Sequence, residues 1–541
     1  MVDGIARLGK IVAVVLCLFC CGPGCRARPS PWARQPSFAV ATPVDRVAAS
    51  PDSSGAVPQD VVEPPDSVAQ AAWKIPDEDL NRAHDIQEPE SPVDALHEDE
   101  VIRTVLEAFP LVWAALQEQE IAGGNLTASL GAYDLQAFAF SNSQPLGFYQ
   151  NHRHAIGFSQ LRATDGSRWF SGYRLGDGRF PDWYGERLTN RGGELAVGAN
   201  IPLRRDRDID PQRARWFKAE QQTLAAEPYI QQQQNVFVRD ATAAYWRWLS
   251  AGMRRNVQQR ILDLARDRAR QIERRVQQGD LPELSLIDND RLIAQREAAA
   301  IDAEQAYQAA TIQLSLFLRD PTGRPLQVSD QRRPATFPEL VLPELPHSDE
   351  EIRRVLQAHP ALAVLNLQIQ QQQVDVQLAR NLVLPRLDLF WETSQDLGAA
   401  SSASRDKSPF ELETGFVADV PLQRREAVGQ LAAARARLEQ LQWERSFLED
   451  SLMTSLQEQI AAMANARQRF ERALANVRLA EQALEIGRRA FLAGDIDLIV
   501  LNIYEQSLAD AVLLQIDAQR AFFLAAVEYR LALGLPMDRS P

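Results

Sequence analysis

Cysteine is almost absent from this sequence. All four cysteines, Cys17, Cys20, Cys21 and Cys25, lie within the first 25 residues of a 541-residue chain. The remainder of the chain therefore has no internal disulfide and no cysteine metal site. An excess of basic charge is also lacking, because 58 Lys and Arg face 72 Asp and Glu, for a formal net charge of -14. This balance argues against a nucleic-acid partner.

A membrane-spanning apolar run is lacking at the N-terminus as well. The uncharged stretch from Ile11 to Cys21 is too short to cross a bilayer. Arg7 and Lys10 precede it and small residues up to Cys25 follow, an order typical of an export signal. Cys25 also resembles the lipid-modified cysteine of bacterial lipoproteins, although Gly22 stands where leucine is usual. Lipidation of Cys25, simple cleavage and an uncleaved anchor remain alternatives.

Proline is missing from the long interval between Pro421 and Pro536. An uninterrupted helix of about 70 residues would be about 100 Å long. Its apolar residues recur every seven positions, at Leu456, Met463, Phe470, Val477, Leu484 and Phe491. This spacing is typical of a coiled coil. A helix of that length does not fit inside a globular core, so we expect it to lie against other helices and to fold back near residues 493–497.

The chain contains an internal repeat. Val197–Leu203 is echoed by Phe416–Leu422, and a long helical run follows each of them. A Gly-Asp pair then recurs, and 42 residues separate Gly279 from Pro321 and Gly494 from Pro536. Landmarks in the same order at nearly the same spacing indicate a tandem duplication. Each copy is predicted to contain a helix, two strands, a long helix, a reversal and a returning helix.

The predicted strands are about ten residues long, and their apolar and polar residues alternate. They are residues 194–201 in the first copy and residues 387–392 and 411–420 in the second. Alternation fits a membrane barrel and also a half-covered soluble sheet. The flanking helices are far longer than the strands and leave no helix to cover the sheet, which favours the barrel. Four strands per chain cannot close a barrel, and open edges are not tolerated in lipid, so we expect three chains to contribute about twelve strands.

These features resemble the TolC family of outer-membrane efflux proteins over roughly residues 94–537. In the second copy the resemblance is carried by His359-Pro360, Leu384–Leu387, Gly415–Leu422, Arg489–Asp495 and Tyr529–Pro536. In the first copy it is carried by Phe109-Pro110, Leu130–Asp134, Gly193-Glu194, Ile201–Leu203 and Arg275–Asp280. The family implies a homotrimer with a twelve-stranded transmembrane barrel in the bacterial outer membrane and an α-helical coiled-coil tunnel in the periplasm.

The resemblance also implies a function. Members of the family are exit ducts for drug efflux pumps and type I secretion systems, and they dock through their helical tips onto a periplasmic adaptor and an inner-membrane transporter. The alternative is a secreted or lipid-anchored periplasmic coiled-coil protein with a structural or adaptor role, whose strands would form a soluble sheet. We divide the chain into a signal peptide (1–25), a disordered Pro-rich tether (26–93), a first repeat (94–325), a linker (326–350) and a second repeat (351–537).

The candidate site residues lie at the two predicted tips. They are Gly279, Asp280, Gly494, Asp495 and Asp497. Glycine suits a reversal that needs a permissive backbone, and the aspartates would place carboxylates where the tunnel narrows. Adaptor docking and a cation-favouring entrance are the functional interpretations of these residues, and helix capping is the structural one, which is compatible with docking.

Two departures from the repeat are informative. The interval between Asp134 and Pro202 is about twice as long as its counterpart in the second copy, and its Gly and aromatic residues indicate a long surface loop with an extended strand. Pro228 falls inside the first long helix and predicts a kink or a later start. No phosphate-binding loop and no nucleophile with its acid and base can be assembled, so we expect no enzyme, no cofactor and no metal site.

Overall fold

The structure is a computed structural model that describes residues 94–279, 282–341, 349–401, 407 and 409–537. All of them belong to one compact unit, Asp85–Pro541. The predictions for residues 1–93, including the signal peptide, Cys25 and the tether, lie outside the described residues, as does Asp280. Among the helices of the described part, none has the length and apolar character needed to cross a membrane.

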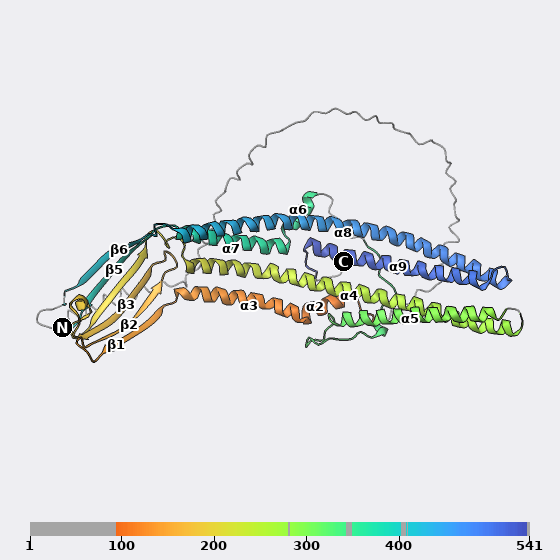
Figure 1. The fold of residues 1–541 in the computed structure, drawn as a ribbon, viewed down its shortest axis with the longest axis horizontal. Coiled ribbons are helices and arrows are strands. Elements are labelled where there is room, and N and C mark those ends of the chain that lie inside the picture. Colours follow the sequence, from red (N-terminus) through yellow and green to blue (C-terminus); the bar gives the residue numbers. More distant parts are fainter. Residues whose placement is uncertain (1–93, 280–281, 342–348, 402–406, 408, 538–541) are drawn as a thin grey trace, which may run out of the picture. The chain divides into compact units, whose positions relative to one another are not determined.

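Two long helices organise the unit (Figure 1). They are α4 (Pro211–Gln277) and α8 (Arg425–Ala493), of 67 and 69 residues. The length of α8 confirms the helix of about 70 residues predicted from the missing prolines. Two shorter helices, α5 (Leu284–Ser315) and α9 (Leu498–Leu533), fold back after the reversals. Two more, α3 (Pro110–Leu130) and α7 (Pro360–Leu382), precede the strands.

The start of α4 has a local cause. Asp210 accepts hydrogen bonds from the backbone N–H groups of Gln212 and Arg213, and Pro211 occupies the first helical position, where no N–H is needed. The helix continues through Pro228. That proline therefore does not set where α4 begins.

The helices form a wall four helices wide. Near the strands, α3 packs on α4, α4 on α7, and α7 on α8. Toward the tips the order is α5, α4, α9 and α8. The two long helices thus extend along the whole wall. The shorter helices α3 and α7 lie beside them near the strands, and α5 and α9 lie beside them toward the tips. One side of the wall is α3 and α5, and the other side is α8.

Four residues of the predicted apolar stripe of α8 are buried against its neighbours, and the other two, Phe470 and Phe491, are half-buried. Leu456 and Met463 are fully covered, and Val477 and Leu484 are at most 7% exposed. Leu456 and Met463 belong to the main core together with residues of α9 and α4, while Val477 packs in a smaller cluster on Ala511. The seven-residue spacing therefore predicted the packing face correctly.

Aromatic side chains fill the middle of the wall. Trp246 of α4 stacks on Phe523 of α9, with ring centroids 4.2 Å apart, and Phe337 stacks on both. The neighbouring Trp248 is fully buried, and the Tyr245 hydroxyl donates to the carbonyl of Leu96. Two short helices, α2 (Glu98–Ala108) and α6 (Asp349–Gln357), contribute side chains to this core. The other short elements are η5 (Asp330–Arg332), η3 (Gly131–Tyr133), which precedes the first strand, and η4 (Asp182–Arg187), which lies in a connection between two strands.

The strands form one antiparallel sheet of six in chain order. They are β1 (Gln136–Gln144), β2 (Asn151–Leu161), β3 (Arg168–Gly178), β4 (Glu194–Pro202), β5 (Arg386–Asp396) and β6 (Glu411–Asp419). The strands predicted near residues 194, 387 and 411 are confirmed as β4, β5 and β6. The prediction of four strands per chain is wrong.

The error lies in the interval from Asp134 to Pro202, which we interpreted as a long loop with one extended strand. It holds β1, β2 and β3 in addition to β4. The alternation that marks a strand in a sequence is interrupted on both faces of these strands. Phe138, Phe140 and Phe170 lie on the face that carries the charged residues, and His152, His154 and Ser171 lie on the opposite face. Sequence alternation is therefore weaker here than in β4, β5 and β6.

His359 joins the start of α7 to the end of α9. Its Nδ1 accepts a hydrogen bond from the backbone N–H of Ala361 at 3.2 Å, and the residue is 8% exposed. A Cβ at Gly534, whose φ is +68°, would lie 2.4 Å from the His359 ring. Burial lowers the pKa of His359, and a hydrogen bond to the Leu531 backbone only partly opposes this shift. The lowered pKa favours the neutral ring in the folded protein at neutral pH.

Acidification should weaken this junction. The unfolded chain binds a proton at His359 near the ordinary pKa of 6.5, whereas the folded chain resists it, so the stabilisation is present above that pH and is lost as the pH falls. Protonated Nδ1 also cannot accept from Ala361. We predict that the thermal midpoint falls between about pH 7.5 and pH 5.5, and falls less in His359→Asn, which keeps a capping acceptor. Equal pH dependence of the two proteins would contradict this.

Candidate functional site

The sheet has two chemically different faces. Strand register places every Asp, Glu and Arg of the six strands on one face, except Asp177 near the end of β3. We call this the polar face. The opposite, apolar face carries mainly aliphatic and aromatic side chains. They include Ile156, Phe158, Tyr173, Val197, Trp391, Leu412 and Phe416.

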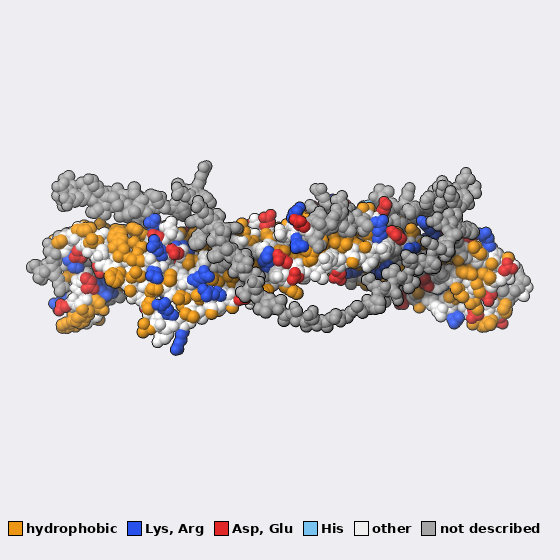
Figure 2. Space-filling model, turned by 90° about the horizontal axis from the view of Figure 1, so that it is seen from above, with side chains coloured by type: hydrophobic (Ala, Val, Ile, Leu, Met, Phe, Trp, Pro, Cys, Tyr) orange, Lys and Arg blue, Asp and Glu red, His pale blue; other side chains and the backbone are white. Residues whose placement is uncertain are grey.

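The apolar face is largely uncovered. Ile156 is 61% exposed and Phe416 is 74% exposed. Of the described helices, only the short η3 packs on a strand beyond marginal contact. Hydrophobic side chains gather over the strands on the face shown in Figure 2. An apolar surface of this extent on a folded protein marks a contact with a membrane or another protein.

Aromatic side chains lie at both ends of the strands. At the end nearer the helices, Trp169 of β3 and Trp391 of β5 meet edge to face across Ala199, with centroids 5.6 Å apart. At the other end, the connections between strands hold Phe148, Tyr149, Trp183 and Tyr184 in a chain of ring contacts. Two aromatic girdles flanking an apolar band are typical of a sheet that crosses a membrane.

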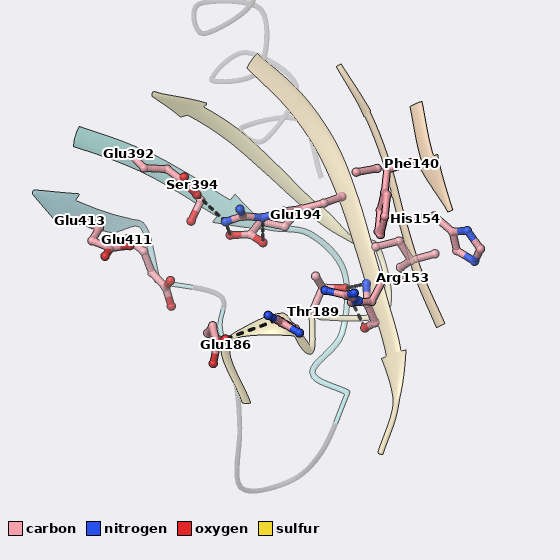
Figure 3. Close-up of a pocket in the computed structure, with 15 residues that line it drawn as sticks. Phe140, Arg153, His154, Glu186, Thr189, Glu194, Glu392, Ser394, Glu411 and Glu413 are labelled. Atoms are coloured by element: carbon pink, nitrogen blue, oxygen red, sulfur yellow. Dashed lines mark hydrogen bonds and ion pairs between the residues drawn. The ribbon is translucent and has the colours of Figure 1, made fainter. Parts of the chain in front are cut away.

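The polar face carries an ion-pair cluster in which Glu194 is buried and Arg174 is partly exposed. Arg174 of β3 donates two hydrogen bonds to Glu194 of β4, at 2.6 and 2.9 Å, and a third to Glu392 of β5 at 2.6 Å. Figure 3 shows Glu194, Glu392 and Ser394 directed to the same side, with His154 pointing away from them. A hollow of about 420 Å³ lies over this cluster and is also bordered by Glu411 and Glu413 of β6. The polar face is thus suited to water and ions.

The tips end the two helical hairpins. Gly494 has a φ of +85°, and the N–H of Asp495 donates to the carbonyl of Ala490 at 2.9 Å. Asp497 is the N-cap of α9, and its carboxylate accepts from the N–H of Val500 at 2.9 Å. Gly279 has a φ of +80°, so both reversals need a backbone that glycine supplies at little cost.

The structure brings the two tips close to one another. The guanidinium of Arg275, near the end of α4, lies 5.9 Å from the ring centroid of Phe491 near the end of α8. Gly494, Asp495 and Asp497 share one turn, and Gly279 lies in the other. Asp280 is outside the described residues, so the second tip carboxylate cannot be placed.

A buried ion-pair cluster above the tips was missed by the sequence analysis. Arg268 of α4 donates to Asn502 and Glu505 of α9, and Arg296 of α5 lies 3.4 Å from the same carboxylate. Each of these charged residues is at most 7% exposed. Burial lowers the pKa of Arg296, and the charge of Arg268 adds to this effect. One carboxylate therefore holds two arginines from the neighbouring hairpin.

The missed signal was a charged or amide residue in a seven-residue seam. Glu505 lies seven residues after Leu498 and seven before Val512, and Arg296 follows the buried Asn289 by seven. A charge at such a position requires a partner on the facing helix. The sequence indicated the charge, but it did not indicate which helix would face it.

Long helical hairpins joined to a sheet with one apolar and one charged face define the structural class of this chain. No protein-family model matches the sequence, and no curated protein matches it either. Solved structures do match.

Three examples, each an outer-membrane protein, illustrate the match. The MtrE outer membrane channel of Neisseria gonorrhoeae, in its open state, aligns with a TM-score of 0.60 at 15% identity, over 81% of this chain and 88% of its own. The outer membrane protein VceC of Vibrio cholerae aligns with 0.58 at 15%, over 81% and 96%. The CmeC outer membrane channel of Campylobacter jejuni aligns with 0.58 at 13%, over 81% and 85%. The likeness establishes the fold, and at that level it confirms the resemblance to the TolC family.

Removing the shared carboxylate should destabilise the hairpin contact. In Glu505→Gln two arginines stay buried without a counter-charge, which costs about 3–5 kcal/mol for a buried pair. We expect a clear fall in the thermal midpoint of the helical circular-dichroism signal. The matched control is Glu485→Gln in the exposed pair with Arg489, which should cost less than about 1 kcal/mol. Similar midpoints for the two variants would show that the cluster contributes little.

Proposed function

We propose that this protein is an outer-membrane channel of the TolC type, the passive exit duct of a tripartite efflux pump or type I secretion system. The observation that carries the proposal is the sheet, whose charged residues lie on one face and whose uncovered apolar face is flanked by aromatic girdles. Such a sheet fits a barrel wall with lipid outside and water inside. The fold shared with outer-membrane channels supports the same function.

The open edges of the sheet require further copies of the chain. In the described structure β1 and β6 each pair on one side only, and unpaired strand edges are not tolerated in lipid. The helical wall also has apolar sides. Exposed residues on them include Leu116 and Ile121 of α3, Ile301 and Ile312 of α5, and Trp443 and Phe447 of α8. A ring of three chains would cover both and place the helices around a continuous tunnel.

The orientation follows from the fold. The barrel would lie in the bacterial outer membrane, and the helices would extend into the periplasm, with the tips farthest from the membrane. The tips would meet a periplasmic adaptor and an inner-membrane transporter, which would supply the energy. The soluble coiled-coil alternative is disfavoured because it leaves the apolar face without a cover.

Conductance tests the proposal directly. Membrane fractionation should place the expressed protein in the outer membrane, and extraction should require detergent. The purified oligomer should have the mass of three chains and should conduct ions in a planar bilayer. A water-soluble monomer or dimer without conductance would contradict the proposal and favour the coiled-coil alternative.

The tip carboxylates can be tested separately from their capping role. Asp497→Asn keeps an acceptor for the Val500 N–H but removes the charge, whereas Asp497→Ala removes both and should cost about 1 kcal/mol. If the tips form a cation-favouring entrance, Asp495→Asn and Asp497→Asn should both shift the reversal potential toward lower cation preference.

The matched control for these variants is Asp510→Asn, farther along α9. It should leave the reversal potential unchanged. An unchanged reversal potential in the Asp495 and Asp497 variants, with lower stability only in Asp497→Ala, would reduce the role of Asp497 to capping.

A further inference from the structure

The hairpin formed by β2 and β3 has the strand length and the two-faced side-chain pattern expected of strands in the wall of a membrane barrel. Both strands are 11 residues long, which matches the length that spans a bilayer. Their side chains follow the same division as the other strands: Arg153 and Arg174 lie on the polar face, and Ile156, Phe158 and Tyr173 lie on the apolar face. A loop lying over the barrel or a plug inside it would have no reason to keep this alternation.

A cross-strand pair of phenylalanine and glycine occurs three times on the polar face. Phe138 of β1 pairs with Gly157 of β2, Phe170 of β3 with Gly198 of β4, and Phe390 of β5 with Gly415 of β6. In each pair the ring lies over the glycine, since a Cβ there would approach the ring within 2.5–2.8 Å. Aromatic rings that cover strand glycines stabilise sheets. The hairpin strands therefore use the same packing as β5 and β6.

The hairpin widens the sheet without shifting its register. Ser159 of β2 pairs with Gln136 of β1 on one side and with Phe170 of β3 on the other. The strands β1 and β3 thus stand at the same level. The two additional strands move the β1 edge sideways by about 10 Å and do not change its height in the sheet.

Both ends of the hairpin region are anchored. At the helix end, the turn holding Asp165 and Ser167 packs on the segment before α4, where a Cβ at Gly166 would lie 2.6 Å from the carbonyl oxygen of Asp206. At the other end, in the connection after β3, the backbone N–H of Asn190 donates a hydrogen bond of 2.7 Å to the carboxylate of Asp396 in β5. These contacts attach the hairpin to both repeats.

The width of six strands fits the helical wall. At about 4.8 Å between strands and a tilt of about 40°, six strands occupy about 37 Å of circumference, and four strands occupy about 25 Å. Four helices spaced about 8–10 Å apart occupy about 32–40 Å. A chain with six strands and four helices therefore passes from barrel to tunnel with no narrowing at the junction.

We propose that all six strands line the barrel, and that three chains close an eighteen-stranded barrel by pairing β1 of each copy with β6 of the next. This inference rests on the proposed function, because it needs a membrane barrel and a trimer. Barrels of sixteen to eighteen strands leave an open aqueous channel. The outer mouth of the duct would then admit larger hydrated solutes than a twelve-stranded mouth.

Single cysteines introduced into the full-length protein test the wall directly. On β2, Arg153→Cys and Ala155→Cys would face water, whereas Ile156→Cys and Phe158→Cys would face lipid. A charged, membrane-impermeant methanethiosulfonate reagent should modify the first two at least about ten times faster than the last two, and should change the single-channel current only for the first two. Glu413→Cys and Phe416→Cys on β6 are the matched controls, and the protein without introduced cysteine gives the background.

The controls separate this inference from the proposed function. Alternating reactivity on both β2 and β6, with a trimer mass from native mass spectrometry, supports eighteen strands. Alternation on β6 together with uniform reactivity on β2, whether fast or slow, overturns the inference and leaves the channel intact. Loss of alternation on β6 as well, without conductance, means that the proposed function has failed. An oligomer of another size overturns the count of eighteen.

Discussion

Backbone hydrogen bonding at the edges of the sheet is the constraint on which the rest of the structure depends. The strands β1 and β6 each have one unpaired edge in the described chain, and the apolar face between them is uncovered. In water this combination invites aggregation, and in lipid it is not tolerated. The proposed ring of identical chains would satisfy every edge at once. The apolar sides of the helical wall fall on α3, α5 and α8, so the same ring would also cover them.

The helical part solves a different problem, which is to keep long helices parallel without a globular core. The seven-residue stripe of α8 supplies continuous packing, and the stack of Trp246, Phe337 and Phe523 ties α4 to α9 in the middle. Toward the tips the packing changes character, because Glu505 and the arginines of the neighbouring hairpin replace apolar side chains. Buried charges specify which helices pair, at a cost in stability. The buried charges are thus concentrated near the tips of the hairpins.

The two halves of the described chain differ mainly in their strands. Their long helices differ by only two residues, 67 against 69, which the proposed tunnel would require, because neighbouring helices of its wall must be equally long. The strand regions differ by a whole hairpin. The proposed closed sheet would accommodate two added strands, because the register is kept and β1 and β3 stand at the same level.

Several features follow from local residues alone and were predictable. Proline and glycine positions marked the long helices and the reversal at Gly494, because these residues act on their own backbone. Heptad spacing predicted the buried face of α8, and alternation predicted β4, β5 and β6. The strands β1, β2 and β3 were not recognised, because Phe138 and Phe170 on the polar face interrupt the alternation, and the glycines of the neighbouring strands that they cover are known only from the register. The partners of Glu505 were equally hidden, since contacts between helices more than 200 residues apart depend on how the hairpins pack.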